Sequence, residues 1–258
     1  MRRNDKPLIL LSNDDGVNAK GINELIRVLR GWADLWVMAP DGPRSGNSGA
    51  ITSERPVRCY PVREEEGLTV YRCTGTPVDC VKLALHSGMP RRPDLVIGGI
   101  NHGDNSSVNV HYSGTMGVVI EGCLKGIPSI GYSLCNHAAD ADFTPLFPYI
   151  RRITEEVWEH GLPEGICLNV NLPDTSDLKG VRICRQTKGE WVNEWKECEH
   201  PHGGRYYWLT GYYDNFEPEA EDSDHWALDH GYVAITPTQI DVTAYRMIDE
   251  LNRWNWQV

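Results

Sequence analysis

The sequence predicts an α/β protein, a Rossmann-like three-layer sandwich with a mostly parallel sheet and a C-terminal arm. Short, uninterrupted apolar runs such as Leu8–Leu11 and Leu95–Ile97 are typical of strands buried on both faces. Segments with helical spacing of apolar residues separate these runs, and such alternation indicates parallel strands covered by helices. A chain of 258 residues can bury a large core within a single domain.

Each element follows from a local pattern. Thr76 followed by Pro77 is typical of an N-cap and a first helical residue. Gly126 and Pro128 end the helix that begins near Ser113. Strands are expected at 8–11, 35–39, 57–62, 68–72, 95–97, 127–134, 165–171, 181–184 and 231–237, and helices after Gly21, from 77 to 85, from 113 to 124, at 149–158 and at 245–252.

Residues 189–228 differ from the rest of the chain. They are rich in aromatic and acidic residues and have little periodicity, so we interpret them as an arm on a single domain of residues 1–258, whose core is about 7–188 and 229–258. So many aromatic side chains are hard to bury against the sheet, and exposed apolar patches mark interfaces. We expect at least a homodimer, with the arm crossing between subunits. The alternative is a flap that covers the site within one chain.

Composition excludes several classes of partner. Lys and Arg number 25 against 36 Asp and Glu, a formal charge of −11, which argues against stable binding to nucleic acid or to an anionic membrane. No apolar run approaches the roughly 18 residues of a membrane span, and no export signal is recognised. Cysteines such as Cys167 and Cys184 lie within apolar runs, as in a reducing compartment. We expect a cytoplasmic protein.

Three polar loops each follow a predicted strand directly. They are Asn13–Gly16, Asp41–Gly49 and Gly98–Asn105. Ligands of open α/β sheets bind outside the carboxyl ends of the strands, where the strand order reverses. The three loops are therefore expected to converge on one site.

The first loop carries adjacent carboxylates, Asp14 and Asp15. Two carboxylates at a buried strand end repel each other and resist desolvation, and a cation relieves both costs. With the hydroxyl of Ser45 and the amide of Asn101, the donors are all oxygens, which favours Mg²⁺, Mn²⁺ or Ca²⁺ over Zn²⁺. The alternative interpretation of Asn13–Gly16 is an ordinary turn.

Two further segments are suited to phosphate. The loop around Ser45 and Gly46 can expose backbone N–H groups to an anion. Ser113, Gly114 and Thr115 open a helix, where hydroxyls and unsatisfied N–H groups form a phosphate site. The alternatives are a solvated loop and ordinary N-capping by Ser113.

Other candidates are weaker. His102 lies beside the predicted site and could donate a proton to a leaving group. A second set is spaced closely enough to suggest zinc but lacks a recognisable fourth ligand; it comprises Cys198, His200 and His202.

Several motifs together resemble the survival protein E (SurE) family, and they occur in order over nearly the whole chain. They are Leu10–Gly16, Ala39–Gly46, Gly75–Val81, Gly99–Asn105, Tyr112–Gly122, Tyr207–Gly211 and Gly231–Pro237. The resemblance implies a divalent-metal-dependent phosphatase that hydrolyses nucleoside monophosphates by metal-activated water. It implies a 5′-nucleotidase, with 3′-nucleotides and short polyphosphate as further candidate substrates.

The resemblance also assigns roles to residues. It implies one divalent cation per subunit, Mg²⁺ or Mn²⁺ with Ca²⁺ as a possible occupant, and a homodimer or homotetramer with exchanged C-terminal segments. The implied metal ligands are Asp14, Asp15, Ser45 and Asn101. The candidate catalytic residues are Asp14, Asp15 and Asn101. The candidate substrate- and phosphate-binding residues are Asn13, Ser45, Gly46, Asn105, Ser113, Gly114 and Thr115.

Two other functions compete with this interpretation. A signalling receiver domain also places paired acids after its first strand, but it needs a phosphoacceptor Asp where this chain has Gly98–Asn101. A nucleotide-binding module without turnover would differ by releasing no phosphate. Which of Asp14 and Asp15 orients or deprotonates the water stays open.

Overall fold

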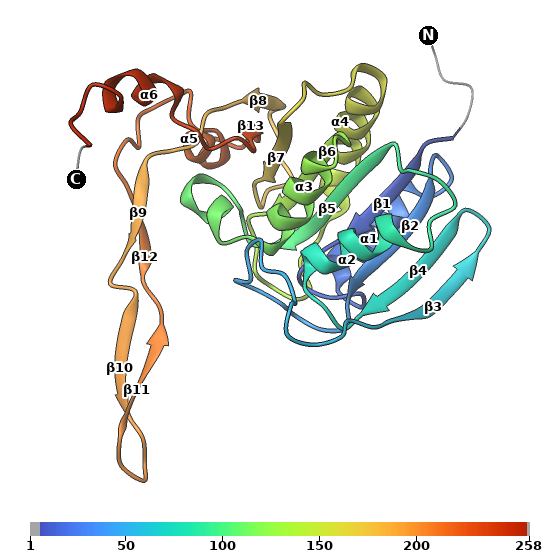
Figure 1. Cartoon of the computed structure of the whole chain (residues 1–258), viewed down its shortest axis with the longest axis horizontal. Coiled ribbons are helices and arrows are strands. Elements are labelled where there is room, and N and C mark those ends of the chain that lie inside the picture. Colours follow the sequence, from blue (N-terminus) through green and yellow to red (C-terminus); the bar gives the residue numbers. More distant parts are fainter. Residues whose placement is uncertain (1–5, 257–258) are drawn as a thin grey trace.

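The computed structural model describes residues 6–256 and centres on a nine-stranded sheet with helices on both faces (Figure 1). The sheet order is β3-β4-β2-β1-β5-β6-β7-β13-β8. The strands of this sheet are β1 (Leu8–Ser12), β2 (Asp34–Pro40), β3 (Cys59–Glu65), β4 (Leu68–Cys73), β5 (Leu95–His102), β6 (Ser129–Leu134), β7 (Ile166–Leu172), β8 (Val181–Ile183) and β13 (Val233–Gln239).

The helices alternate with these strands in the first half of the chain, as the sequence predicts. They are α1 (Lys20–Leu29), α2 (Pro77–His86), α3 (Gly114–Leu124), α4 (Phe147–His160), α5 (Asp224–Asp229) and α6 (Tyr245–Leu251), with short 3₁₀ turns η1 (Ser107–His111) and η2 (Thr144–Leu146). None of the helices that the structure describes is long and apolar enough to cross a bilayer.

The sheet is mostly parallel, and its order reverses at β1. Strands β4, β2, β1, β5, β6 and β7 run parallel to one another. The edge strand β3 pairs antiparallel with β4, and β13 pairs antiparallel with β7. Because β2 lies on one side of β1 and β5 on the other, the carboxyl ends of β1 and β5 form the switch point of the sheet.

Alternating side chains of β1 build both layers of the core. Ile9 and Leu11 pack with α1 and α4 on one face, and Leu8 and Leu10 pack with α2 and α3 on the other. All four side chains are buried. A continuous apolar run is therefore what a strand between two helical layers requires, and the predicted three-layer sandwich is confirmed.

The start of α2 forms the predicted cap. Thr76 Oγ1 accepts a hydrogen bond from the Asp79 amide at 3.1 Å, and Asp79 Oδ2 accepts one from the Thr76 amide at 2.8 Å. Pro77 occupies the first helical turn, where its missing N–H costs nothing. This capping box fixes the chain direction at the start of the helix.

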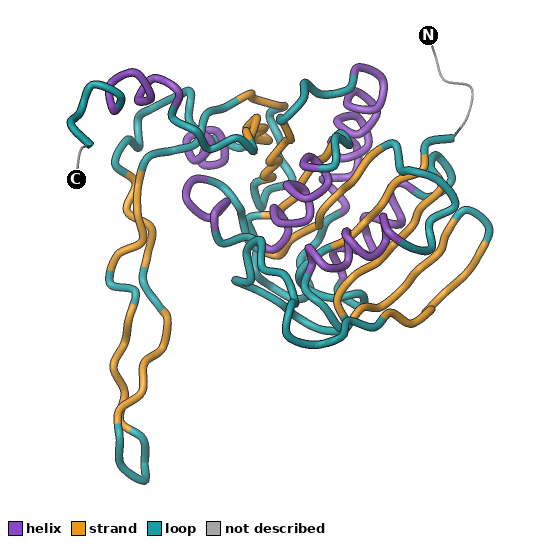
Figure 2. The backbone as a smooth tube through the Cα atoms, in the orientation of Figure 1, coloured by secondary structure: helices purple, strands orange, loops and turns teal. Residues whose placement is uncertain are grey.

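Residues 189–216 contain strands that the sequence pattern did not predict. They form two short antiparallel pairs, one of β9 with β12 and one of β10 with β11, in a hairpin that projects from the body (Figures 1 and 2). Strand periodicity arises from burial of one face, and β11 is exposed at every residue. The strands are β9 (Gly189–Val192), β10 (Trp195–Glu199), β11 (Arg205–Leu209) and β12 (Tyr212–Asn215).

Two other details differ from the sequence expectation. Strand β5 extends to His102, beyond the apolar run that ends at Ile97, so polar residues continue the strand. The short helix α5, which the sequence pattern did not predict, packs against β13. Only Asp224 and Ala227 of α5 are buried, which is too short a pattern to reveal a helix.

Candidate functional site

The polar loops converge at the switch point, as the sequence analysis expects. Asp14 and Asp15 follow β1 directly, and Asn101 lies near the end of β5, the strand that pairs with β1. The loop after β2 is attached to the same place, because the Arg44 amide donates to the Asp14 carbonyl at 2.7 Å. This edge of the sheet is where α/β folds bind ligands.

Asn13 shapes the turn that presents the two carboxylates. Its Oδ1 accepts from the Gly16 amide at 3.2 Å, and its Nδ2 donates to the Gly16 carbonyl at 3.0 Å. Gly16 has φ +101°, a conformation that a residue with a Cβ avoids. Sequence reasoning placed Asn13 with the phosphate-binding residues. In the structure both polar atoms of its side chain bond within the turn.

Asp14 is a buried carboxyl group held against the start of α3. Its side chain is 5% exposed, and Thr115 Oγ1 donates to Asp14 Oδ1 at 2.5 Å. Desolvation by burial raises the pKa of Asp14 to about 6, against the lowering effect of the Thr115 hydrogen bond. A Cβ at Gly114 would lie 2.7 Å from Asp14 Cβ, so only glycine permits this approach.

Asp15 is half-buried and lies beside His102. Burial raises the pKa of Asp15 too, against a lowering effect of His102. The His102 amide is 3.5 Å from Asp15 Oδ2, while His102 Nδ1 lies 3.0 Å from the Ala138 carbonyl. The ring packs edge-on against Phe143. His102 is therefore next to the carboxylates, with one ring nitrogen directed at backbone.

Asn101 presents its amide oxygen to the same threonine as Asp14. Asn101 Nδ2 donates to the Gly103 carbonyl at 2.8 Å, and Asn101 Oδ1 lies 3.5 Å from Thr115 Oγ1. Because the amide nitrogen is committed to the backbone, the oxygen faces the site. Sequence reasoning assigned Thr115 to phosphate, and the structure adds that Thr115 links Asp14 and Asn101.

Ser45 and Gly46 lie in the loop that Arg44 attaches to Asp14. Arg44 also pairs with Asp41 at 2.8 Å, which ties its side chain to its own loop. Ser45 and Gly46 are exposed. Their hydroxyl and amide groups are open to a ligand, and the Arg44 amide supplies the attachment to the carboxylate turn.

Asn105 is embedded in a buried polar cluster beneath the loop. Its Nδ2 donates to Ser133 Oγ at 2.8 Å, its amide to Asn171 Oδ1 at 2.7 Å, and its carbonyl accepts from Asn169 Nδ2 at 2.7 Å. Sequence reasoning missed Ser133, Asn169 and Asn171. The signal was available for the last two, since Asn169 and Asn171 share one face of an otherwise apolar strand.

Ser113 caps the helix whose first residues reach Asp14. Its Oγ accepts from the Met116 amide at 2.9 Å, so this hydroxyl serves the ordinary capping role. The backbone of Gly114 also donates to Asp14 and lowers the pKa of that carboxyl. The positive end of the α3 dipole therefore faces the site, which favours bound anions.

The donor set fits a hard divalent cation. Asp14, Asp15 and Asn101 contribute oxygens only, the ligands that Mg²⁺, Mn²⁺ and Ca²⁺ prefer. Their desolvated carboxylates would gain most from a cation. Zinc finds no comparable place: residues 6–256 contain no group of three His, Cys, Asp or Glu side chains arranged for a metal, the Cys198, His200 and His202 set included.

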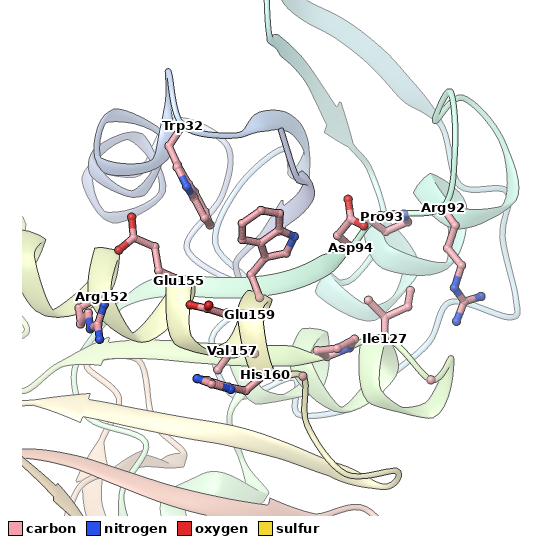
Figure 3. Close-up of a pocket in the computed structure, with 14 residues that line it drawn as sticks. Trp32, Arg92, Pro93, Asp94, Ile127, Arg152, Glu155, Val157, Glu159 and His160 are labelled. Atoms are coloured by element: carbon pink, nitrogen blue, oxygen red, sulfur yellow. The ribbon is translucent and has the colours of Figure 1, made fainter. Parts of the chain in front are cut away.

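A cavity of about 770 Å³ lies at the opposite end of the sheet (Figure 3). It is lined by Asp94 and Pro128, which directly precede β5 and β6. Its charged groups largely pair with neighbours, as Glu155 does with Arg151 at 2.6 Å and His160 with Glu156 at 3.1 Å. This cavity is separate from the carboxylate site.

Paired carboxylates beside a helix N-terminus, at the switch point of an α/β sandwich, define a protein suited to a divalent cation and a phosphate. The chain belongs to the survival protein SurE family, whose model matches residues 9–193.

Two relatives carry the name 5′-nucleotidase SurE. The protein of Phocaeicola vulgatus is 78% identical over 99% of this chain and all of its own length. That of Bacteroides thetaiotaomicron is 63% identical over 98% of both chains. The crystal structure of the SurE protein from Aquifex aeolicus superposes with a TM-score of 0.82 at 33% identity, covering 95% of this chain and 98% of its own.

Proposed function

We propose that this protein is a 5′-nucleotidase, a phosphoric monoester hydrolase that requires a divalent cation and acts on nucleoside monophosphates. The observation that carries the proposal is the convergence of Asp14, Asp15 and Asn101 beside the N-terminus of α3. The names of the relatives support the reaction and its substrate class.

Asp14, Asp15, Ser45 and Asn101 are the proposed ligands of one cation, Mg²⁺ or Mn²⁺, with Ca²⁺ as another ion of the same donor preference. When bound, such a cation neutralises phosphoryl charge and activates a water molecule. Thr115 orients Asp14 through the 2.5 Å hydrogen bond. Asp15 accepts no hydrogen bond from Thr115 and is the more accessible of the two carboxylates. We therefore propose that Asp15 orients the attacking water.

The phosphate-binding groups lie on two segments. The Thr115 amide, at the positive end of the α3 dipole, would donate to an equatorial oxygen of the phosphoryl group, where charge accumulates. The neighbouring Gly114 and Met116 amides already donate to Asp14 and to Ser113 Oγ. Gly46 and the hydroxyl of Ser45 would contact it from the loop after β2, which is open to solvent. Asn105 would support the phosphate from beneath, because the buried polar cluster of Ser133, Asn169 and Asn171 holds Asn105 in place.

Phosphate release from AMP and GMP tests the function. We expect hydrolysis with Mg²⁺ or Mn²⁺ and none after chelation, because carboxylates without a cation repel phosphate. Full activity in a chelated, metal-free sample would refute the proposal. Binding of AMP without phosphate release would instead indicate a nucleotide-binding module. The same assay with 3′-AMP and tripolyphosphate decides whether the substrate range is wider.

The arm supports an assembly of at least two subunits. Trp195, Trp208 and Leu209 are 65%, 62% and 66% exposed, and isolated two-stranded hairpins are marginally stable in water. We propose a cytoplasmic homodimer or homotetramer that covers this surface. The net charge of −11 makes stable binding to nucleic acid or anionic membranes unfavourable.

A further inference from the structure

One loop connects Asn101 to the start of α3. This connecting loop, residues 103–113, runs from the end of β5 through η1 to Ser113. Its inner part is fixed to the sheet, because Asn105 bonds to Ser133, Asn169 and Asn171. The loop therefore carries Asn105, and its outer part leads directly into the N-terminus of α3, where phosphate is proposed to bind.

The outer part of the loop is fixed by the base of the arm, strands β9 and β12. Trp191 of β9 donates from Nε1 to Asn109 Oδ1 at 2.8 Å. The hydroxyls of Tyr213 and Ser107 are hydrogen-bonded to each other. Ser107 Oγ also donates to the Thr187 carbonyl at 2.9 Å, just before β9. Both strands of the arm base thus contact η1.

The buried carboxylate of Asp224 connects the connecting loop to the segment before β9. Asp224 is 0% exposed and accepts from the amides of Ser107 at 2.9 Å, Thr187 at 3.0 Å and His225 at 2.9 Å. The Thr187 hydroxyl adds a fourth bond at 2.5 Å. A buried carboxylate with this many donors is well satisfied without a counter-cation. It ties the connecting loop to the approach to the arm and to α5.

The backbone of Ser107 is strained. Its φ is +50°, a left-handed conformation that is unfavourable for a residue with a Cβ. Such a conformation persists only where surrounding contacts impose it. The contacts that impose it here come from Asp224, Thr187 and Tyr213, not from the sheet.

We propose that Trp191 and Tyr213 are positioning residues for the phosphate-binding start of α3: the arm base holds η1, and η1 leads through Tyr112 and Ser113 into the N-terminus of α3. The proposal rests on the proposed function. The arm is thus part of the working site as well as a surface for assembly, because its base supports the loop that binds phosphate.

Two conservative variants test this role. Trp191→Phe removes the indole N–H that bonds to Asn109 and reduces the bicyclic indole to a single ring, whereas Tyr213→Phe removes only the hydroxyl that bonds to Ser107. Trp208→Phe is the matched control, since Trp208 is an exposed tryptophan of β11 on the outer arm. The measurements are the KM for AMP, the Kd of inorganic phosphate by calorimetry with Mg²⁺ present, the Mg²⁺ concentration for half-maximal activity, and the thermal midpoint.

We expect Trp191→Phe and Tyr213→Phe to raise the phosphate Kd and the KM together by about three- to tenfold, the effect of one lost hydrogen bond. The Mg²⁺ concentration for half-maximal activity should change less than the phosphate Kd, because Asp14 and Asp15 lie on another segment and Asp14 contacts α3 through Thr115 and Gly114. Combining Trp191→Phe with Asn109→Ala should cost no more than Asn109→Ala alone, since both remove the Trp191–Asn109 hydrogen bond and Asn109→Ala removes the bond to Asp104 as well.

Phosphate affinities equal to that of Trp208→Phe would overturn the inference. So would a lower thermal midpoint with unchanged phosphate affinity, which indicates a structural role alone. If the wild-type protein binds phosphate but hydrolyses no nucleotide, the proposed function fails, while the comparison of phosphate Kd values still decides the positioning role.

Discussion

The carboxylate site and the outer arm place side chains in opposite and equally unusual environments. At the site a carboxyl group, Asp14, is 5% exposed, whereas on the arm an indole, Trp208, is 62% exposed. Charged groups are rarely buried without a partner, and large apolar patches are rarely exposed without one. The proposed occupants, a cation at the site and a second protein surface on the arm, would each relieve the unusual environment.

The two regions also differ in how their shape is maintained. Asp14 is held by β1, by Thr115 and by the loop after β2, so contacts within the protein fix its position. The outer arm, by contrast, is held together by the hairpin bonds between β10 and β11 and by contacts within it such as that of Arg205 with Glu197. The comparison implies that loss of charge at the site should affect chemistry, and loss of the outer arm should affect assembly.

The largest effect is expected for Asp14→Asn and Asp15→Asn. Each removes one negative charge with little change of shape, so we expect nucleotide hydrolysis to fall by on the order of 10² or more. Thermal stability should stay unchanged or rise, because carboxylate repulsion is relieved. Asp140→Asn, at an exposed position, is the control. Wild-type turnover in either variant would show that Asp14 and Asp15 form an ordinary turn with no catalytic role.

The second prediction concerns pH and the metal-free protein. The pKa of Asp14 is raised to about 6 in the folded state, above its unfolded value. Its contribution to stability is therefore complete below about pH 4 and is lost as the pH rises through 6. In chelator, the free energy of unfolding of the wild type relative to that of Asp14→Asn should fall by about 3 kcal/mol in total, most of it between pH 4 and pH 7.

Mg²⁺ should reverse this loss. At pH 7 the cation binds the folded carboxylates and should raise the thermal midpoint of the wild-type protein, with little effect on Asp14→Asn. If the difference in unfolding free energy between the wild type and Asp14→Asn stays constant from pH 4 to 7, burial of the Asp14 carboxylate does not destabilise the fold and the prediction is wrong.

The smallest effect on the site is expected from removing the outer arm. The Thr210 amide donates to the Glu194 carbonyl at 2.6 Å, so these two residues can close a two-residue turn. Replacing 195–209 by Asn-Gly uses the turn that hairpins of this length prefer. Light scattering should show a smaller assembly, with activity per subunit changed less than about threefold, since Trp191 and Tyr213 remain.

A monomeric mass for the intact protein at micromolar concentration would contradict assembly altogether. An unchanged assembly after the replacement would place the interface elsewhere, for example on the exposed C-terminal residues Trp254 and Trp256, which are 54% and 64% exposed. If the replacement lowers both the assembly mass and the activity per subunit, the outer arm supports the site too, as we propose for the arm base.

Sequence patterns predicted the body of the protein better than the arm. The buried strand Leu8–Ser12 and the cap at Thr76 carry local signals of burial and of hydrogen bonding. The strands of the arm carry none, because neither face of β11 is buried. Among site residues, adjacency revealed Asp14 and Asp15. The links made by Thr115 and Asn171 connect residues far apart in the chain.

The sequence by itself determined the fold class and the oxygen chemistry of the site, because strand period, capping and residue type act over a few neighbouring residues. Only the tertiary structure decided which oxygens meet. The bond from Thr115 to Asp14 spans 101 positions, and that from Trp191 to Asn109 spans 82. Such contacts follow from the strand order around β1 and from the docking of the arm base on η1, which no local pattern encodes.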